Sequence, residues 1–367
     1  MERLTGLRTR GPVELAAPAA PGSLLDVGLV LTHACNLACA YCYTGEKKRV
    51  RMPEAVAMQA VESAIAVARA AQAKLQLTFF GGEPLLEAQL LLDIAARARS
   101  LADGLPFVMQ VTTNGTLLDA ALVEQLGALG VHLAISIDGT RAQHEAARPL
   151  AGGGSSWETT RRGLDLLLAA RDRFSFDVVA VVDPGTVHLL GDGVRELLDL
   201  GVDAITLNAN FGGVWGEPEL AVLEQQLEVV AALVVAWLRR GRWVGVQPLE
   251  SALRSFAEIG RVVTASCGAG SRRLAVAPSG RIYGCCRAVG EDTGKGALGH
   301  LDDGLPGPQA GGAGCACANA EETGDPRVAG AVQLRHDRAV QRVGLRLATL
   351  LCAEYELLHI VERGPCP

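Results

Sequence analysis

The sequence predicts an α/β fold in which helices cover a parallel β-sheet. After the first 23 of the 367 residues, strand-like and helix-like segments alternate in six consecutive pairs. This alternation is typical of parallel sheets, because parallel neighbours need a crossover connection. Glycine-containing polar motifs follow several predicted strands, at the end where barrel enzymes place their reactive groups. The length allows one large barrel and a smaller module.

Each predicted strand is a short apolar run, and each predicted helix is a longer run with apolar residues three or four positions apart. The predicted strands are Asp26–Leu31, Leu75–Phe80, Phe107–Thr112, Leu133–Ile137, Phe176–Val182 and Ala204–Asn208. The predicted helices are Pro53–Ala71, Leu86–Ala102, Ala120–Leu129, Trp157–Arg171, Val187–Leu200 and Glu217–Arg240. A doubly wound sheet has the same alternation, and periodicity alone does not separate it from a barrel.

Composition excludes several classes of protein. The ten cysteines cluster in metal-ligand spacings, which argues against a secreted disulfide scaffold and predicts a reducing, cytoplasmic location. Residues 1–23 are expected to be a flexible tail without the apolar core of a signal peptide. No stretch reaches about 18 uncharged apolar residues, so no membrane span is predicted. The net charge is −6 with both signs interleaved, so nucleic acid is not an expected partner.

Three cysteines within eight residues follow the first predicted strand. Cys35, Cys39 and Cys42 have the spacing Cys-x3-Cys-x2-Cys. Clusters this tight ordinarily bind an iron–sulfur cluster or zinc, and a structural zinc site would need a fourth nearby ligand. His33 is the nearest candidate for that fourth ligand. Three buried cysteines on one helix face would not have this spacing.

The motif, with the aromatic Tyr41 before the third cysteine, resembles the signature of the radical S-adenosylmethionine (SAM) superfamily. The resemblance implies an open, partial (β/α)6 barrel similar to a TIM barrel. It also implies a [4Fe–4S] cluster whose fourth iron is chelated by the methionine moiety of SAM. An electron from such a cluster cleaves SAM to a 5′-deoxyadenosyl radical, which abstracts a hydrogen atom from the substrate.

A second motif, Gly81-Gly82-Glu83-Pro84, ends the second predicted strand. Glycines let the backbone approach a ligand closely, and a carboxylate can receive an ammonium group. Alone, these four residues would be read as an ordinary turn. About forty residues after the cysteines, they resemble the Gly-Gly-Glu-Pro motif that binds the amino group of SAM.

Further SAM-binding positions are implied by the same resemblance. Ser136 at the end of the fourth strand is expected near the ribose, and Arg148 is expected to pair with the SAM carboxylate, for which a guanidinium is well suited. A surface arginine is the alternative for Arg148. Asn114 and Asp138 follow strands as well and could equally be turn formers.

Two segments at the predicted barrel mouth are candidates for substrate contact. The glycine-rich stretch Ala151–Ser156 is expected to be a mobile, gating loop. Asn208–Trp215 brings amides and aromatic rings to the end of the sixth strand, where a substrate could lie; packing beneath the loop is the alternative for Trp215.

A second group of cysteines lies in the C-terminal third. Cys267 and Cys285 flank a predicted hairpin around Pro278-Ser279-Gly280. The spacing resembles the start of the SPASM and twitch modules, which bind auxiliary four-iron clusters. Together with Cys315 and Cys317 it would fit one auxiliary cluster. Cys352 is a rival ligand within a predicted helix at 328–361, and the ligand roles of Cys286 and Cys366 stay open.

The predicted organisation is a radical SAM barrel over 24–242 and an auxiliary iron–sulfur module with a C-terminal helix over 243–367. The resemblance implies modification of a ribosomally synthesised precursor peptide by cross-linking, epimerisation or oxidation. Alternatives are sulfatase maturation, a twitch-type small-molecule dehydrogenase, and a non-catalytic peptide-binding scaffold. A flavodoxin or ferredoxin is expected as electron donor. A separate leader-binding protein is possible, since about 24 residues before the first strand cannot form a winged-helix domain.

Overall fold

The computed structural model describes residues 24–253, 268–307 and 338–346. Several of the expected features lie outside these residues. They include most of the predicted C-terminal helix and the cysteines Cys267, Cys315, Cys317, Cys352 and Cys366.

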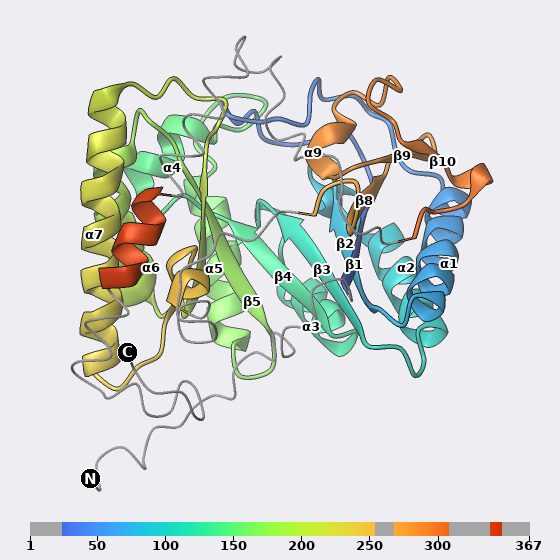
Figure 1. Cartoon of the computed structure of the whole chain (residues 1–367), viewed down its shortest axis with the longest axis horizontal. Coiled ribbons are helices and arrows are strands. Elements are labelled where there is room, and N and C mark those ends of the chain that lie inside the picture. The colour runs from blue at the N-terminus through green and yellow to red at the C-terminus, as the bar shows by residue number, and fades with distance from the viewer. Residues whose placement is uncertain (1–23, 254–267, 308–337, 347–367) are drawn as a thin grey trace, which may run out of the picture.

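One curved sheet of ten strands forms the centre of the structure (Figure 1), in the order β10-β9-β8-β1-β2-β3-β4-β5-β6-β7. Strands β1 to β7 are parallel and follow one another in chain order. A doubly wound sheet would reverse its order near the first strand, so that alternative is wrong and the predicted partial barrel is confirmed. The strands are β1 (Leu24–Val30), β2 (Lys74–Phe80), β3 (Phe107–Thr113), β4 (Val131–Ser136), β5 (Phe176–Val182), β6 (Ala204–Ala209) and β7 (Gly245–Gln247).

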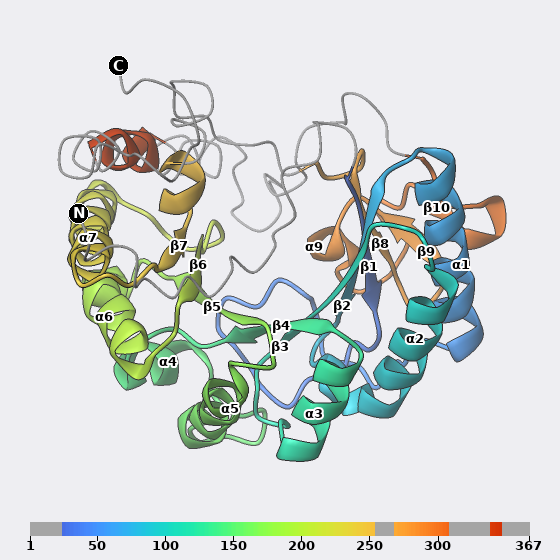
Figure 2. The same cartoon turned by 90° about the horizontal axis from the view of Figure 1, so that it is seen from below.

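Helices cover the convex, outer face of this sheet, and the concave face is turned inward (Figure 2). The covering helices are α1 (Glu54–Ala70), α2 (Ala88–Leu101), α3 (Ala120–Ala128), α5 (Trp157–Ala170), α6 (Leu190–Leu200) and α7 (Glu217–Arg239). Short 3₁₀ turns at Pro84–Glu87 and Val187–Leu189 precede α2 and α6.

All six predicted strands and all six predicted helices are present, with ends within three residues of those expected. The sequence does not predict α4 (Arg141–Ala147) or the three-residue β7. Helix α4 begins with a capping box, in which Thr140 Oγ1 accepts the Gln143 N–H and the Gln143 side chain accepts the Thr140 N–H. A threonine followed three residues later by glutamine is a helix-start signal that could have revealed α4.

The two faces of the sheet have different chemistry. In β2, Leu75, Leu77 and Phe79 are fully buried in the core between sheet and helices, whereas Gln76 and Thr78 are half-buried on the other face. Successive side chains of a strand point to opposite faces, so this alternation separates an apolar outer layer from a polar inner one. The inner face is therefore suited to a polar ligand.

The predicted hairpin after Cys267 is confirmed and extends the barrel sheet. β8 (Arg273–Val276) pairs antiparallel with β9 (Arg281–Tyr283) and parallel with β1. A one-turn helix, α9 (Cys286–Val289), and the short β10 (Gly299–His300) follow. Cys286 packs on Gly28 of β1, where an added Cβ would lie 2.3 Å from its sulfur. Glycine at this position thus lets α9 approach the inner face of β1.

Among the described helices, α7 is long and apolar enough to cross a membrane by length and composition. Its apolar side chains, including Leu223, Leu227 and Val230, are buried in the core of the barrel. Residues 338–346 form a helix beside it, with an ion pair between Arg342 and Glu224. Packing within the protein accounts for the apolar face of α7.

Candidate active site

The three N-terminal cysteines lie on the long segment that connects β1 with α1, at the carboxyl ends of the strands (Figure 1). Their thiols are free; Cys35 and Cys39 are half-buried and Cys42 is exposed. Within the described part of the chain, no three His, Cys, Asp or Glu side chains are arranged to hold a single metal ion. Sulfurs around one zinc ion lie about 3.8 Å apart, whereas a four-iron cluster binds its cysteines at separate corners. The three thiols therefore suit a four-iron cluster better than a single zinc ion.

Several N–H groups point at the cysteine sulfurs. The Leu37 N–H donates to Cys35 Sγ (3.4 Å), and Lys47 Nζ donates to Cys42 Sγ (3.0 Å). Burial raises the pKa of Cys35 to about 11. Desolvation also acts to raise the pKa of Cys42, but hydrogen bonds from Lys47 and Thr44 outweigh it and lower that pKa. Hydrogen-bond donors of this kind stabilise the thiolate form of cysteine. They also tune the reduction potential of an iron–sulfur cluster that the thiolates bind.

The Gly-Gly-Glu motif holds the start of the cysteine segment. The N–H groups of Gly82 and Glu83 donate to the carbonyls of Thr32 and Ala34, both at 2.8 Å. An added Cβ would lie 2.5 Å from the Thr32 oxygen at Gly81 and 2.2 Å from the Ala34 oxygen at Gly82. The observed reason for the glycines is thus close approach to the backbone leading into Cys35.

This contact predicts a large effect for Gly82→Ala. The added methyl group must displace the backbone at Ala34, so we expect a loss of about 1–3 kcal/mol in the free energy of unfolding and reduced iron incorporation. Urea unfolding and iron analysis after anaerobic reconstitution measure both. Gly152→Ala is the matched control, since a Cβ there meets nothing within 4 Å. Equal stability and equal iron content in the two variants would contradict this explanation of the motif.

Glu83 itself is buried and joins two strand ends. Its carboxylate accepts hydrogen bonds from the Leu85 N–H (2.9 Å), the Thr113 hydroxyl (2.7 Å) and the Asn114 N–H (2.8 Å). Burial raises its pKa to about 7, although these donors favour the ionised form. Glu83 therefore fixes the end of β2 to the end of β3.

Tyr41, Asp138 and Arg148 form a buried network that sequence reasoning did not foresee. Arg148 donates from Nε and Nη2 to the two oxygens of Asp138, both at 2.9 Å. The Tyr41 hydroxyl donates to the same carboxylate, and the Val181 N–H donates to it from β5 (2.9 Å). The guanidinium also lies 5.2 Å from the Tyr41 ring centroid. Asp138 is thus a junction between the cysteine segment and two strands, and Arg148 is buried rather than at the surface.

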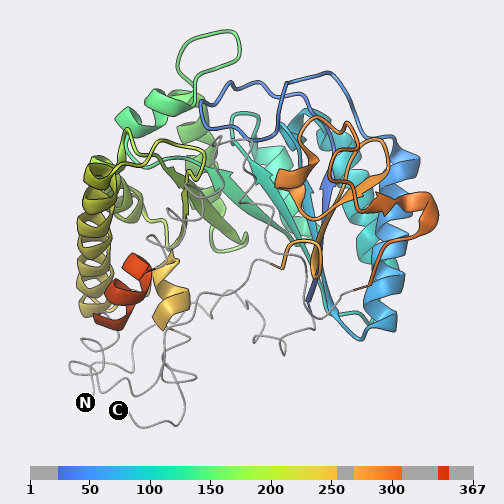
Figure 3. The same ribbon diagram turned by 45° about the horizontal axis from the view of Figure 1, so that its top comes forward.

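The segment after Arg148 pairs with the cysteine segment. The Ala38 N–H donates to the Pro149 carbonyl (2.9 Å), and the Ala151 N–H donates to the Asn36 carbonyl (2.9 Å). Residues 149–155 form a small hairpin, closed by a bridge between Pro149 and Ser155, which projects beyond α4 (Figure 3). Its glycine tip is exposed, while its base lies against the predicted cofactor loop.

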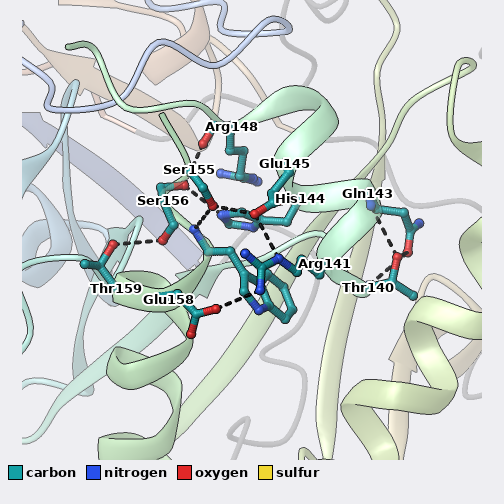
Figure 4. A network of polar contacts seen from close by, with 11 residues as sticks. Thr140, Arg141, Gln143, His144, Glu145, Arg148, Ser155, Ser156, Glu158 and Thr159 are labelled. Carbon is teal, nitrogen blue, oxygen red and sulfur yellow. Dashed lines mark hydrogen bonds and ion pairs between the residues drawn. The ribbon is translucent and has the colours of Figure 1, made fainter. Parts of the chain in front are cut away.

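Figure 4 shows how the base of this hairpin is fixed. The Ser156 hydroxyl donates to the Arg148 carbonyl (2.6 Å) and lies 2.9 Å from His144 Nε2. The imidazole contacts Trp157 edge to face, and burial lowers the pKa of His144 to about 4. The neutral side chain of His144 therefore connects the end of α4 with the start of α5 through Ser156 and Trp157. Ser156 thus lies at the fixed base, and mobility of the predicted loop Ala151–Ser156 stays a prediction.

Ser136 is half-buried at the end of β4, two residues before Asp138. Asn208 is exposed near the end of β6, while its neighbour Leu207 is in the core. Trp215 is buried, and its indole N–H donates to the Asn210 carbonyl (2.7 Å). Packing therefore accounts for Trp215, and Asn208 remains available to a ligand.

Polar residues also line the inner face of the sheet, which the sequence analysis missed. Asp26 of β1 accepts hydrogen bonds from Thr78 (3.1 Å) and Arg273 (2.9 Å). His132 of β4 lies 2.7 Å from Asp177 of β5. Period-two alternation within the predicted strands was the signal that could have identified them.

The chain is similar in sequence to several known proteins. Residues 29–187 match the model of the Radical SAM superfamily. The chain is 25% identical over 312 residues to a serine-type anaerobic sulfatase-maturating enzyme of Klebsiella aerogenes, covering 83% of this chain and 76% of that protein. It is 28% identical over 279 residues to a PqqA peptide cyclase of Streptomyces rochei, covering 74% and 71%.

The fold is similar to a solved structure described as native anSMEcpe with bound AdoMet and Kp18Cys peptide. The TM-score is 0.64 at 18% identity, over 76% of this chain and 78% of that one. Residues 29–187 are thus similar in sequence to the Radical SAM superfamily, and the cysteine motif and the strand order are consistent with that similarity.

Proposed function

We propose that Cys35, Cys39 and Cys42 hold a [4Fe–4S] cluster, that SAM binds beside it, and that the enzyme modifies a ribosomally synthesised peptide. The observation that carries the proposal is the set of three free thiols on one segment above the strand ends, held there by Gly82, Glu83 and the hairpin after Arg148. When bound, the two cofactors supply a 5′-deoxyadenosyl radical that removes a hydrogen atom from the substrate.

The chain's own groups would orient SAM. Asp138 occupies Nε and Nη2 of Arg148, which leaves the N–H groups of Nη1 for the SAM carboxylate. The three hydrogen bonds to Glu83 make its carboxylate a fixed acceptor, with lone-pair capacity remaining for an ammonium group. Tyr41, Pro84 and Ser136 complete the proposed SAM site, with the backbone of Gly81 and Gly82.

A peptide substrate is supported by the relatives and by the shape of the barrel. The names of the two relatives refer to protein and peptide modification, and the similar structure contains a peptide. The concave face of the sheet presents hydrogen-bonding groups such as Asn208 and Asp177, which suit a peptide backbone. A flavodoxin or ferredoxin would supply the electron, and a separate protein could bind a leader sequence.

The auxiliary cluster is also a proposal. Cys285, the one of its four proposed ligands that the structure describes, is a buried, free thiol directly before α9. Cys267, Cys315 and Cys317 would complete its set of ligands. A second function, oxidation of a serine or cysteine in a sulfatase, is favoured by similarity to the Klebsiella enzyme over most of both chains.

Mass spectrometry separates the two functions. The reconstituted protein is incubated anaerobically with SAM, reductant and either short peptides encoded beside its gene or a sulfatase peptide containing the target residue. We expect a SAM-dependent mass change in a neighbouring peptide and slower hydrogen exchange at 151–156 when that peptide binds. A change in the sulfatase peptide alone would favour the second function. Cleavage of SAM with no change in any peptide would contradict both.

A further inference from the structure

The short helix α9 and the turn after it lie against the segment that carries the N-terminal cysteines. In the sequence, α9 is more than 200 residues away from this segment, yet Figures 1 and 3 show it beside the connection from β1 to α1. It reaches this place because β8 adds to the β1 edge of the sheet, and Gly28 leaves room for Cys286. The C-terminal hairpin therefore brings specific side chains to the cysteine segment.

The first contact is made through Tyr43, the residue after Cys42. Its ring is stacked with that of Phe80 at the end of β2, with centroids 6.2 Å apart and planes 7° from parallel. The guanidinium of Arg287 in α9 lies 4.9 Å from the Tyr43 centroid. Cation–π contact at this distance is favourable, because the ring face attracts a cation. Tyr43 thus joins the cysteine segment to both the barrel and α9.

The second contact is made by Glu291. Its carboxylate accepts the Glu46 N–H (3.4 Å) and pairs with Lys48 Nζ (3.1 Å). Gly45 has a φ of +72°, and an added Cβ would lie 2.7 Å from Glu291 Cγ. Backbone conformation and close approach therefore both require glycine at position 45.

These contacts act on a different part of the segment from those described for the active site. The backbone of residues 32–34 is hydrogen-bonded to Gly82 and Glu83, and the backbone of residues 36–40 is hydrogen-bonded to residues 147–151. Residues 43–48 are the part that meets Arg287 and Glu291. This part includes Lys47, which donates to Cys42 Sγ. Its position thus affects the third cysteine most directly.

We propose that Arg287 and Glu291 are positioning residues that hold the 43–48 turn, and with it Cys42, in the conformation that accepts the cluster. The inference rests on the proposed role of Cys42 as a ligand. It gives the C-terminal hairpin a function that does not depend on any auxiliary cluster. We call Arg287 and Glu291 the clamp. Without the clamp, the segment would lose order at Cys42 while the barrel stays folded.

Hydrogen exchange on the full-length, iron-free protein tests the clamp without using activity. In Arg287→Ala/Glu291→Ala, the amides of residues 43–48 should exchange at least about threefold faster, because loss of these contacts favours local opening of the segment. Amides of β1 and β2 should be unchanged. The control Arg162→Ala/Glu62→Gln alters exposed residues of α5 and α1 and should leave 43–48 as in the parent protein. The single variant Arg287→Lys, which keeps a cation beside Tyr43, should exchange more slowly at 43–48 than the double alanine variant does.

Iron incorporation provides the second readout. After anaerobic reconstitution, the clamp variant should bind less iron at the N-terminal site and show a broadened electron paramagnetic resonance signal. Exchange at 43–48 equal to that of the control would overturn the clamp. If instead exchange rises but iron and signal do not change, positioning of Cys42 is overturned. Failure of the proposed function gives a different result. If Cys42 is not a ligand, Cys42→Ala itself keeps the full iron content of the N-terminal site.

Discussion

Replacing Cys35, Cys39 and Cys42 together by alanine is expected to reduce the cleavage of SAM to 5′-deoxyadenosine below detection. The three thiols are the proposed protein ligands of the SAM-binding cluster, and the variant removes all of them. The measurement is chromatography of 5′-deoxyadenosine formed under anaerobic, reducing conditions. Undiminished cleavage in the triple variant would contradict the assignment of the ligands.

Iron content makes the same variant more informative. If an auxiliary cluster is present, the triple variant should retain about four irons per chain. Cys286→Ala is the matched thiol control, since Cys286 packs on Gly28 and lies outside the proposed N-terminal ligand set; it should keep SAM cleavage. Iron near zero in the triple variant, with circular dichroism unchanged, would leave Cys285 a structural residue.

Asp138→Asn is expected to produce the largest loss of stability. Asp138 neutralises the buried guanidinium of Arg148 and also accepts hydrogen bonds from Tyr41 and Val181. Removing one charge from a buried pair costs on the order of 3 kcal/mol, because the remaining ion is left uncompensated. Urea unfolding measures the change in free energy.

Two comparisons identify the cause of that loss. Asp165→Asn removes an exposed i,i+4 pair with Arg161 and should change stability by less than about 1 kcal/mol. Asp138→Asn/Arg148→Met should recover part of the loss, because no unpaired charge then stays buried. Equal unfolding midpoints for Asp138→Asn and Asp165→Asn would show that the Arg148 pair contributes little.

Much of the barrel could be predicted from the sequence because its signals are local. Each strand is a compact apolar run, and each covering helix repeats its apolar residues at helical spacing, as in β5 (Phe176–Val182), whose ends agree with the prediction. The cysteine and Gly-Gly-Glu motifs are also local, and the structure places them in contact through the hydrogen bond from the Glu83 N–H to the Ala34 carbonyl.

Features that depend on distant residues could not be predicted in this way. The pairing of β8 with β1 is set by the closure of the sheet, and nothing near Gly28 indicates that Cys286 will pack on it. The role of Asp138 is similar: its short motif is typical of a turn, and only the fold brings Tyr41 and Arg148 to its carboxylate. Such roles emerge from tertiary contacts, for which local patterns give no signal.

The central claim is that SAM binds at a cluster held by Cys35, Cys39 and Cys42. Electron paramagnetic resonance of the reduced, reconstituted protein tests it most directly, with spectra recorded before and after addition of SAM. The signal should change on addition of SAM in the parent protein and in Cys286→Ala, and the SAM-sensitive signal should be missing from the triple variant. A parent spectrum that SAM leaves unchanged, or a SAM-sensitive signal that persists in the triple variant, would contradict the claim.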